Sequence, residues 1–114
     1  KGLNNQTDAL ALMQILETIA TGQAVSKSAS TEMTGILTRQ KFRAGIPAGI
    51  PEGIPAGNKT GSITGIEHDA AIVFPPGRKP YVLVILTRGV PTSTEGEKLI
   101  ARLSGIVYQQ IGGK

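Results

Sequence analysis

The sequence predicts an α+β fold, an antiparallel sheet with helices packed on its faces. Two observations carry this prediction: apolar residues recur with helical spacing at both ends of the chain, and three extended segments lie between them. The expected order is helix, helix, three strands, helix, and the short links between the strand segments favour an antiparallel meander. A length of 114 residues suits one small domain with a single core.

Two helices are predicted before the sheet, over residues 7–21 and 27–40. Thr7 is the expected N-cap of the first, and Ser26 or Ser28 that of the second, because a hydroxyl can satisfy a free N–H of the first turn. Each helix has one apolar stripe: Leu12, Ile15, Leu16 and Ile19 in the first, and Ala29, Met33, Ile36 and Leu37 in the second.

Residues 45–57 repeat the tetrapeptides Gly-Ile-Pro-Ala and Gly-Ile-Pro-Glu. Proline has no N–H to donate, and it is excluded from helix interiors and central strands. We therefore expect this segment to be extended, to lie on the surface and to lead into the first strand.

The sheet is predicted from three segments, 58–64, 68–74 and 81–87. Ala70–Phe74 and Val82–Leu86 are continuously apolar, which is typical of strands covered on both faces. A closing helix is expected over residues 95–111, with Thr94 and Glu97 forming a capping box at its start.

Composition excludes several classes of function. The chain has no Cys, which rules out disulfides, zinc–cysteine clusters and thiol catalysis, and with a single His we expect neither a metal nor another cofactor. The net charge is +4, but apart from Arg78-Lys79 the basic residues are scattered singly, so nucleic-acid binding is not predicted. No apolar run reaches the roughly 18 residues of a membrane span.

Two other candidate sites, a phosphate-binding loop and a catalytic His–Asp pair, are excluded by their geometry. The segment before Thr60 resembles a phosphate-binding loop, but Pro55 removes an N–H donor and an Asn separates the last glycine from Lys59. His68 and Asp69 are neighbours on a predicted strand and point to opposite faces, so they cannot form the His–Asp pair of a catalytic triad. A structural or hydrogen-bonding role is favoured for His68.

The motif Lys59-Thr60-Gly61 opens the first predicted strand. Lys59 supplies a positive potential and Thr60 a hydroxyl donor, which together suit a carboxylate ligand. Gly61 lets a ligand lie against the backbone without meeting a side chain. The three residues therefore indicate one wall of an anion-binding site.

The motif is followed by two more predicted strands and a closing helix. In this order of elements the chain resembles the C-terminal part of a class A β-lactamase-like serine hydrolase. Lys-Thr-Gly is one of three signatures of these enzymes and of penicillin-binding proteins, and the other two, Ser-x-x-Lys and Ser-Asp-Asn, do not occur in the sequence. The resemblance implies a fragment, which supplies three strands of the family's five-strand sheet. The catalytic Ser would then belong to an absent N-terminal portion of the same domain.

The resemblance also implies a function and a site. The intact protein is expected to hydrolyse β-lactam rings through an acyl-enzyme, as an exported protein of a bacterium (secreted, periplasmic or on the cell surface) that confers antibiotic resistance. Lys59 would act in catalysis, Thr60, Gly61 and Ser62 would bind substrate, and the Ser62 N–H would form half of the oxyanion hole. Residues 1–114 alone are expected to be inactive, since the nucleophile is missing.

Two alternatives stay open. One is a D,D-peptidase or other penicillin-binding relative that acts on a D-Ala-D-Ala-like substrate, and the other is a non-catalytic module that keeps the fold and forms homo-oligomers or swapped dimers. Many class A enzymes place an Arg on the strand after the motif, whereas this chain has Glu67, His68 and Asp69 there. Carboxylate binding would then depend on Thr60, Ser62 and other residues, which counts against efficient β-lactamase activity.

Overall fold

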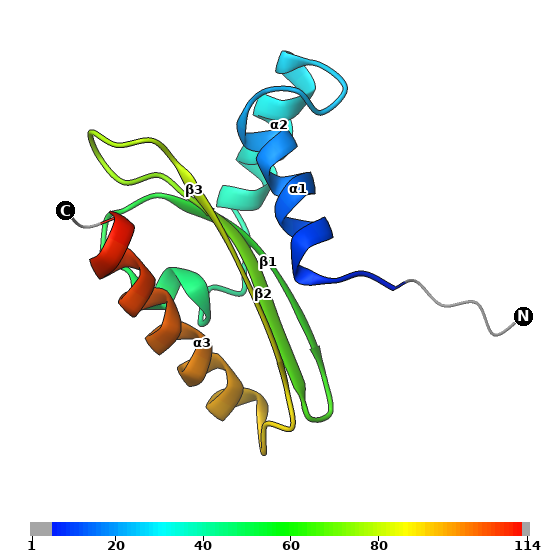
Figure 1. Ribbon diagram of the computed structural model, residues 1–114, viewed down its shortest axis with the longest axis vertical. Helices are drawn as coiled ribbons and strands as arrows, with labels where there is room; N and C mark the ends of the chain where they lie inside the picture. Colours follow the sequence, from blue (N-terminus) through cyan, green and yellow to red (C-terminus); the bar gives the residue numbers. More distant parts are fainter. Residues whose placement is uncertain (1–5, 113–114) are drawn as a thin grey trace, which may run out of the picture.

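The computed structural model describes residues 6–112, in which a three-stranded antiparallel sheet lies between two layers of helices (Figure 1). The elements are α1 (Ala9–Ala20), α2 (Lys27–Thr38), the 3-10 helix η1 (Ile46–Gly49), β1 (Ala56–Ile63), β2 (Ile66–Val73), β3 (Tyr81–Arg88), α3 (Ser93–Val107) and the π-helical turn η2 (Tyr108–Gly112). The strands follow one another in the order β1-β2-β3. The predicted α+β class and antiparallel meander are confirmed.

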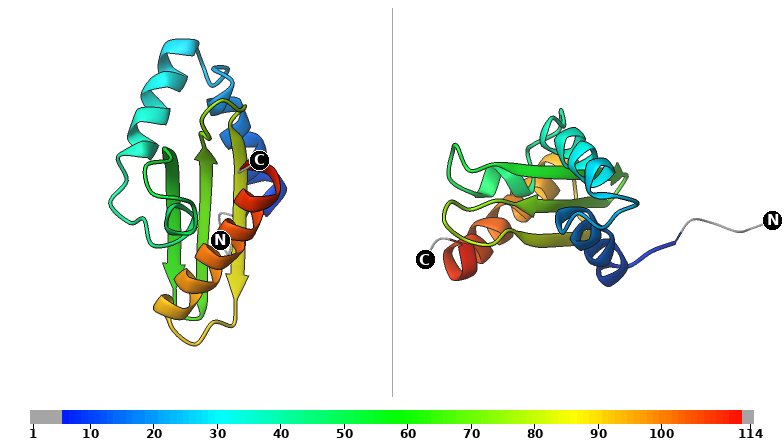
Figure 2. Two further views of the ribbon diagram at one scale, coloured as in Figure 1. Left: turned by 90° about the vertical axis from the view of Figure 1, so that its left-hand side faces the viewer. Right: turned by 90° about the horizontal axis from the view of Figure 1, so that it is seen from above.

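The two faces of the sheet are covered by different parts of the chain. Helices α1 and α2 lie on one face, here called the α1 face, and α3 with η1 lies on the other, the α3 face (Figure 2). The main core is on the α3 face and consists of Ile46, Ile50, Ala56, Ala71, Val73, Ile100 and Tyr108. On the α1 face the buried apolar side chains include Leu16 and Ile72.

A two-residue turn, Thr64-Gly65, joins β1 to β2 and fixes their register. Gly65 has φ 75°, a conformation that glycine adopts at little cost. The turn pairs Ile63 with Ile66 and Ser62 with Glu67. The strands thus begin two residues earlier than predicted (residues 56 and 66 in place of 58 and 68), and Glu67 lies within β2 and not in a loop.

The repeat over 45–57 is the largest departure from the expected structure. Its first unit forms η1, and Ile46 and Ile50 are buried in the core, whereas an extended surface segment was predicted. Pro47 is compatible with this short helix because it lies in the first turn, where its missing N–H would have no partner. The two isoleucines become buried because they fill the space between the sheet and α3.

Two predicted helix caps are wrong by one or two residues. Asp8 and not Thr7 caps α1, with its carboxylate accepting a hydrogen bond from Ala11 N at 2.8 Å. The capping pair of α3 is Thr92 with Glu95, and not Thr94 with Glu97, because the extended backbone at Thr92 lets its hydroxyl accept from Glu95 N at 3.1 Å. Of the two predicted caps of the second helix, Ser26 is the one observed: its hydroxyl accepts a hydrogen bond from Ala29 N.

The predicted apolar stripes of α1 and α2 are only partly buried. Leu16 faces the sheet, but Ile15 and Ile36 are 56% and 52% exposed. The sheet covers only one flank of each helix, so side chains at the margin of the stripe stay in contact with solvent. No helix within residues 6–112 combines the length and apolarity that crossing a membrane requires.

Helix α3 approaches η1 so closely that glycine is required at the contact. A Cβ at Gly49 would overlap the carbonyl oxygen of Ala101 and lie 2.9 Å from Ser104 Cβ. The buried Ser104 hydroxyl donates to Ile46 O at 2.8 Å and ties the two helices together. The backbones therefore pack directly against one another at this point.

We predict opposite effects for two Gly→Ala substitutions. Gly49→Ala should lower the free energy of unfolding by about 1–3 kcal/mol, because backbone atoms of α3 cannot move aside for the new methyl group. Gly35→Ala, inside α2, should raise it by up to about 1 kcal/mol through helix propensity. Chemical denaturation of the purified variants measures both.

Gly35 is the matched control because its nearest neighbour is a flexible side-chain end, the Arg39 guanidinium, which can rotate away. A Gly49→Ala protein as stable as the parent would contradict the close contact described for α3 and η1.

Candidate active site

The motif Lys59-Thr60-Gly61 lies on β1, which is an edge strand of the described sheet. Alternation along the strand directs Lys59 and Gly61 to the α1 face and Thr60 and Ser62 to the α3 face. A cavity of about 300 Å³ opens beside the motif, between α1 and the sheet. It is lined by Thr7, Leu12, Ile15, Leu16, Lys59, Thr60, Gly61, His68, Asp69, Ala70 and Leu86.

The backbone of the motif strand is open at the edge of β1 that no other described strand pairs with. Lys59 is exposed, and its ammonium donates to the carbonyl oxygen of Thr60 at 2.6 Å. That carbonyl is therefore accessible from the edge, and in an antiparallel ladder the outward direction recurs at every second residue. Ser62, two residues further on, accordingly directs its own N–H to the same edge. The Thr60 hydroxyl forms no side-chain hydrogen bond with another residue in the described range 6–112.

A buried hydrogen-bond network fixes the position of β1 immediately before the motif. The Asn58 side chain is fully buried and its amide donates to Asp69 Oδ1 at 3.0 Å and to Phe42 O at 2.9 Å. The other oxygen of Asp69 accepts from Ile46 N at 2.8 Å. Three segments, η1, β1 and β2, thus meet at one carboxylate, and the loop after α2 is joined to them through Asn58.

Arg43 joins this network from the loop after α2. Its guanidinium donates to Ala56 O at 3.0 Å and lies 3.5 Å from Asn58 Oδ1. Burial raises the pKa of Asp69 above its ordinary value of 3.8, while the hydrogen bonds from Asn58 and from backbone N–H groups and the charge of Arg43 act in the opposite direction. Desolvation is the largest of these effects.

A second buried carboxylate lies under the end of the motif strand. Glu67 is 3% exposed and its Oε1 accepts a hydrogen bond from the Ser62 hydroxyl at 2.8 Å. Ser93, in the first turn of α3, places its hydroxyl oxygen 3.3 Å from that of Ser62. The side chain of Ser62 is therefore held between β2 and α3.

His68 and Asp69 point to opposite faces, as expected from their adjacency. Asp69 belongs to the network with Asn58, whereas the imidazole of His68 lines the cavity on the α1 face. His68 Nδ1 lies 3.1 Å from Thr87 N, which donates to it, and 3.0 Å from Glu67 O. Its ring is thus anchored to the backbone of β2 and β3 next to Gly61, its partner in the ladder.

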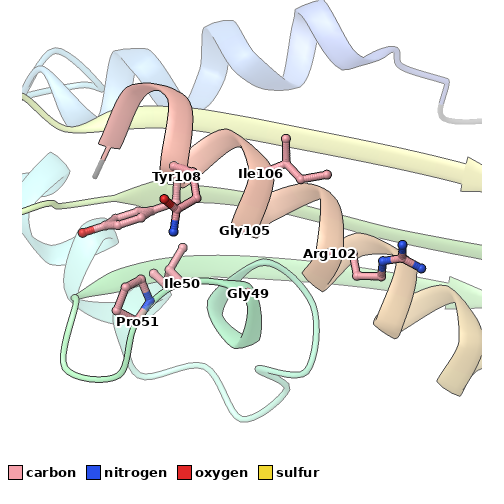
Figure 3. A pocket seen from close by; sticks show the side chains of 8 residues that line it. Gly49, Ile50, Pro51, Arg102, Gly105, Ile106 and Tyr108 are labelled. Carbon is pink, nitrogen blue, oxygen red and sulfur yellow. The ribbon is translucent and has the colours of Figure 1, made fainter. Parts of the chain in front are cut away.

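Another cavity, of about 560 Å³, lies between η1 and α3 (Figure 3). Arg102 and Ile106 line it on α3, Ile50 and Pro51 line it on the opposite side, and Tyr108 and Gln109 line it at the C-terminal end. None of the predicted site residues contributes to it. The polar side chains that suit anion binding gather instead at β1.

Sequence reasoning placed the motif correctly on the first strand but missed the contact of Ser62 with Glu67 and Ser93. Counting outward from the turn Thr64-Gly65 would have paired Ser62 with Glu67. Nothing local in the sequence indicates Ser93, because its contact depends on how α3 returns across the sheet.

The raised pKa of Asp69 predicts a specific dependence of stability on pH. Between 3.8 and its raised value, the folded protein retains a proton that the unfolded chain has lost, so the free energy of unfolding falls as pH rises through this interval. Asp69→Asn removes the titration. As pH rises above 3.8, the free energy of unfolding of the parent should therefore fall relative to that of Asp69→Asn. The difference between the two proteins should become constant once the pH exceeds the raised pKa of Asp69.

Denaturant titrations across pH measure this difference, and Glu52→Gln, which removes a charge from an exposed position, serves as the control. A difference between Asp69→Asn and the parent that stays constant with pH would contradict the raised pKa.

Comparison with known proteins gives a consistent result. Residues 1–111 match the model of a family described as the beta-lactamase enzyme family. No curated protein matches the sequence. Among solved structures, the chain is similar to a beta-lactamase from Sphaerobacter thermophilus, with 28% identity and a TM-score of 0.81 over 90% of this chain and 40% of that one.

Two further structures are similar. A class A beta-lactamase from Mycobacterium abscessus is 31% identical, with a TM-score of 0.81 over 90% of this chain and 41% of that one. A protein named PBP-A is 25% identical, with a TM-score of 0.87 over 98% of this chain and 46% of that one. The chain spans less than half the length of these structures. From the family match and this shared fold we conclude that the chain belongs to the beta-lactamase enzyme family.

Proposed function

We propose that this chain is the C-terminal part of the catalytic domain of a serine β-lactamase-like hydrolase, which opens β-lactam rings through an acyl-enzyme. The observation that carries the proposal is the Lys59-Thr60-Gly61 motif on an edge strand, with an exposed ammonium and a hydroxyl free of side-chain hydrogen bonds within residues 6–112. Family membership makes a hydrolase of this type the expected activity of the intact protein.

The proposed roles follow from the directions of these groups. Lys59 provides the positive potential and Thr60 a hydroxyl donor for the ligand's anionic group. Gly61 leaves the strand edge open, since a Cβ there would meet only His68 Cβ at 3.9 Å. The outward N–H of Ser62 would bind the oxyanion that forms when a carbonyl is attacked.

The nucleophilic serine would come from a further part of the same domain. Two observations support such a part: the chain spans about 40% of its lactamase relatives, and it exposes apolar side chains along two helices. These are Leu99, Leu103 and Ile106 on α3, and Leu10, Met13 and Ile15 on α1. Exposed apolar surface of this extent indicates packing against more protein.

Residues 1–114 alone should therefore show no turnover, because the Ser-x-x-Lys signature is absent from them. In isolation the apolar helix faces and the edge of β3, which no other strand pairs within residues 6–112, would favour self-association. The same surfaces would allow the chain to act as a non-catalytic oligomerising module. For the intact protein we propose export by a bacterium and a role in β-lactam resistance.

A penicillin-binding relative, such as a D,D-peptidase, is the second candidate. The TM-scores to two PBP-A structures are both 0.87, above the 0.81 of the two lactamases, and one of them is an acyl-enzyme complex with penicillin G. Both candidates share acyl transfer to a serine. They differ in whether the acyl-enzyme is hydrolysed quickly.

Lys59→Ala tests the role of the motif in a longer protein that includes the upstream residues. We expect kcat/KM for nitrocefin to fall about 100- to 1,000-fold, the usual cost of losing one preorganised electrostatic contact to the transition state. Initial rates of nitrocefin hydrolysis measure the change.

Lys79→Ala is the matched control, because it removes an exposed lysine from the turn before β3 and should leave the rate unchanged. Undiminished turnover in Lys59→Ala would refute the role proposed for Lys59, and the absence of both acylation and turnover in the parent protein would refute the proposed function.

A further inference from the structure

The imidazole of His68 is held by the backbone of β3 through one of its two nitrogens. Thr87 N donates to Nδ1 at 3.1 Å, so Nδ1 accepts and carries no hydrogen. An Nδ1–H directed at Glu67 O would place two hydrogens between Nδ1 and Thr87 N, and that oxygen already accepts from the Thr87 hydroxyl at 2.6 Å. The ring hydrogen therefore lies on Nε2, the nitrogen farther from the backbone.

This Nε2–H group belongs to a side chain that faces the cavity beside the motif. His68 lines that cavity together with Lys59 and Gly61. Gly61 is the partner of His68 in the ladder, and a Cβ there would lie 3.9 Å from His68 Cβ, so glycine leaves the space next to the ring open. Among residues 6–112 no group accepts a hydrogen bond from Nε2. A donor in a largely apolar cavity costs free energy unless an acceptor is supplied.

The two faces of the sheet differ in how much room they leave at the motif. On the α3 face the first turn of α3 closes over the end of the strand pair, since a Cβ at Gly96 would lie 2.7 Å from Glu67 Cβ. On the α1 face, α1 begins beside the middle of the sheet, and within the described chain no helix covers the half toward the β1–β2 turn (Figure 1). Leu86, the neighbour of His68 on β3, is 38% exposed there.

Acyl transfer restricts where the serine-bearing segment of the proposed domain can lie. The nucleophile attacks a carbonyl whose oxygen lies about 3 Å from an oxyanion donor, here the Ser62 N–H. Reacting atoms are about 3–3.5 Å apart in a productive complex. The segment must therefore reach β1, and the α1 face beside Gly61 is where the described chain leaves room for it. The chain spans less than half the length of similar structures, so the rest of such a domain is long enough to supply this segment.

We propose that His68 is a positioning residue for the nucleophile: its Nε2–H donates a hydrogen bond to the serine-bearing segment and holds that segment against Gly61 on the α1 face. The inference rests on the proposed acyl-transfer function and adds to it a residue outside the Lys-Thr-Gly motif. His68 contacts neither the substrate nor the reacting atoms. It fixes the distance between the nucleophile and the oxyanion donor, and with it the rate of acylation.

Two substitutions isolate the Nε2 donor in a longer protein that includes the upstream residues. His68→Phe and His68→Gln both remove the Nδ1 acceptor of Thr87 N, but Gln keeps an N–H donor at about the reach of Nε2 and Phe has none. Stopped-flow acylation by a fluorescent penicillin gives the limiting acylation rate and the dissociation constant of the noncovalent complex separately.

His68→Phe should lower the limiting acylation rate about 100-fold, the cost of displacing a reacting group by roughly 1 Å, whereas His68→Gln should stay within about 10-fold of the parent. The dissociation constant should be unchanged in both variants, because Lys59, Thr60 and Ser62 still bind the substrate.

His68→Asn provides a second route if His68→Phe does not fold. Its amide oxygen can accept from Thr87 N in place of Nδ1, but its side chain is too short to reach the position of Nε2, so acylation should slow as it does in His68→Phe. A merely structural role for His68 predicts the opposite order: Asn would retain the acylation rate, and Gln would lose it together with Phe.

The outcomes separate the inference from the proposed function. An acylated parent combined with an unchanged limiting rate in His68→Phe and His68→Asn, or with an equal fall in His68→Phe and His68→Gln, would overturn the inference and leave the proposed function standing. A parent that is neither acylated nor turns over nitrocefin would overturn both. If no variant folds, NMR of the ring nitrogens in the parent decides: a slowly exchanging Nε2–H supports the inference, and a hydrogen on Nδ1 contradicts it.

Discussion

The hydrogen bond from Asn58 to Asp69 connects parts of the chain that are distant in sequence and holds the motif strand in place. Asn58 directly precedes Lys59, and Asp69 also receives the N–H of Ile46, from which η1 extends under α3. Since Asn58 is fully buried, an alternative partner from solvent is not accessible. An unpaired polar group in such a position would cost more free energy than the hydrogen bond itself contributes.

From this anchor, the two ends of β1 acquire different environments. At Asn58 the strand is enclosed by the loop after α2 and by η1, whereas Lys59 is exposed and Ser62 lies beside the first turn of α3. A rigid base with an open edge is suited to a binding site, because the ligand-facing groups keep their directions without a ligand. The polar side chains of β1 thus serve the fold at the start of the strand and the site further along it, according to their position and not to the face they occupy.

The sequence alone was sufficient to predict the helices and strands and their order, because helical spacing and continuous apolar segments are strong local signals. It failed at Ile46 and Ile50, where proline and glycine indicated an exposed segment but tertiary packing buried the isoleucines. The motif was located from its residue types alone. Its surroundings were not, because the contacts of Ser62 with Glu67 and Ser93 depend on strand register and on the return of α3, which local patterns do not encode.

The brevity of the turn Thr64-Gly65 has a consequence for how the chain tolerates changes in length. Side chains on a strand alternate between faces, so a one-residue slip of β2 against β1 would part Asp69 from Asn58 and turn the core side chains of Ala71 and Val73 to the α1 face. The register of the motif strand is thus fixed by the core and by the buried network together, and not by the turn alone. An inserted residue is expected to be accommodated within the loop itself, where a longer connection leaves the pairing of β1 with β2 unchanged.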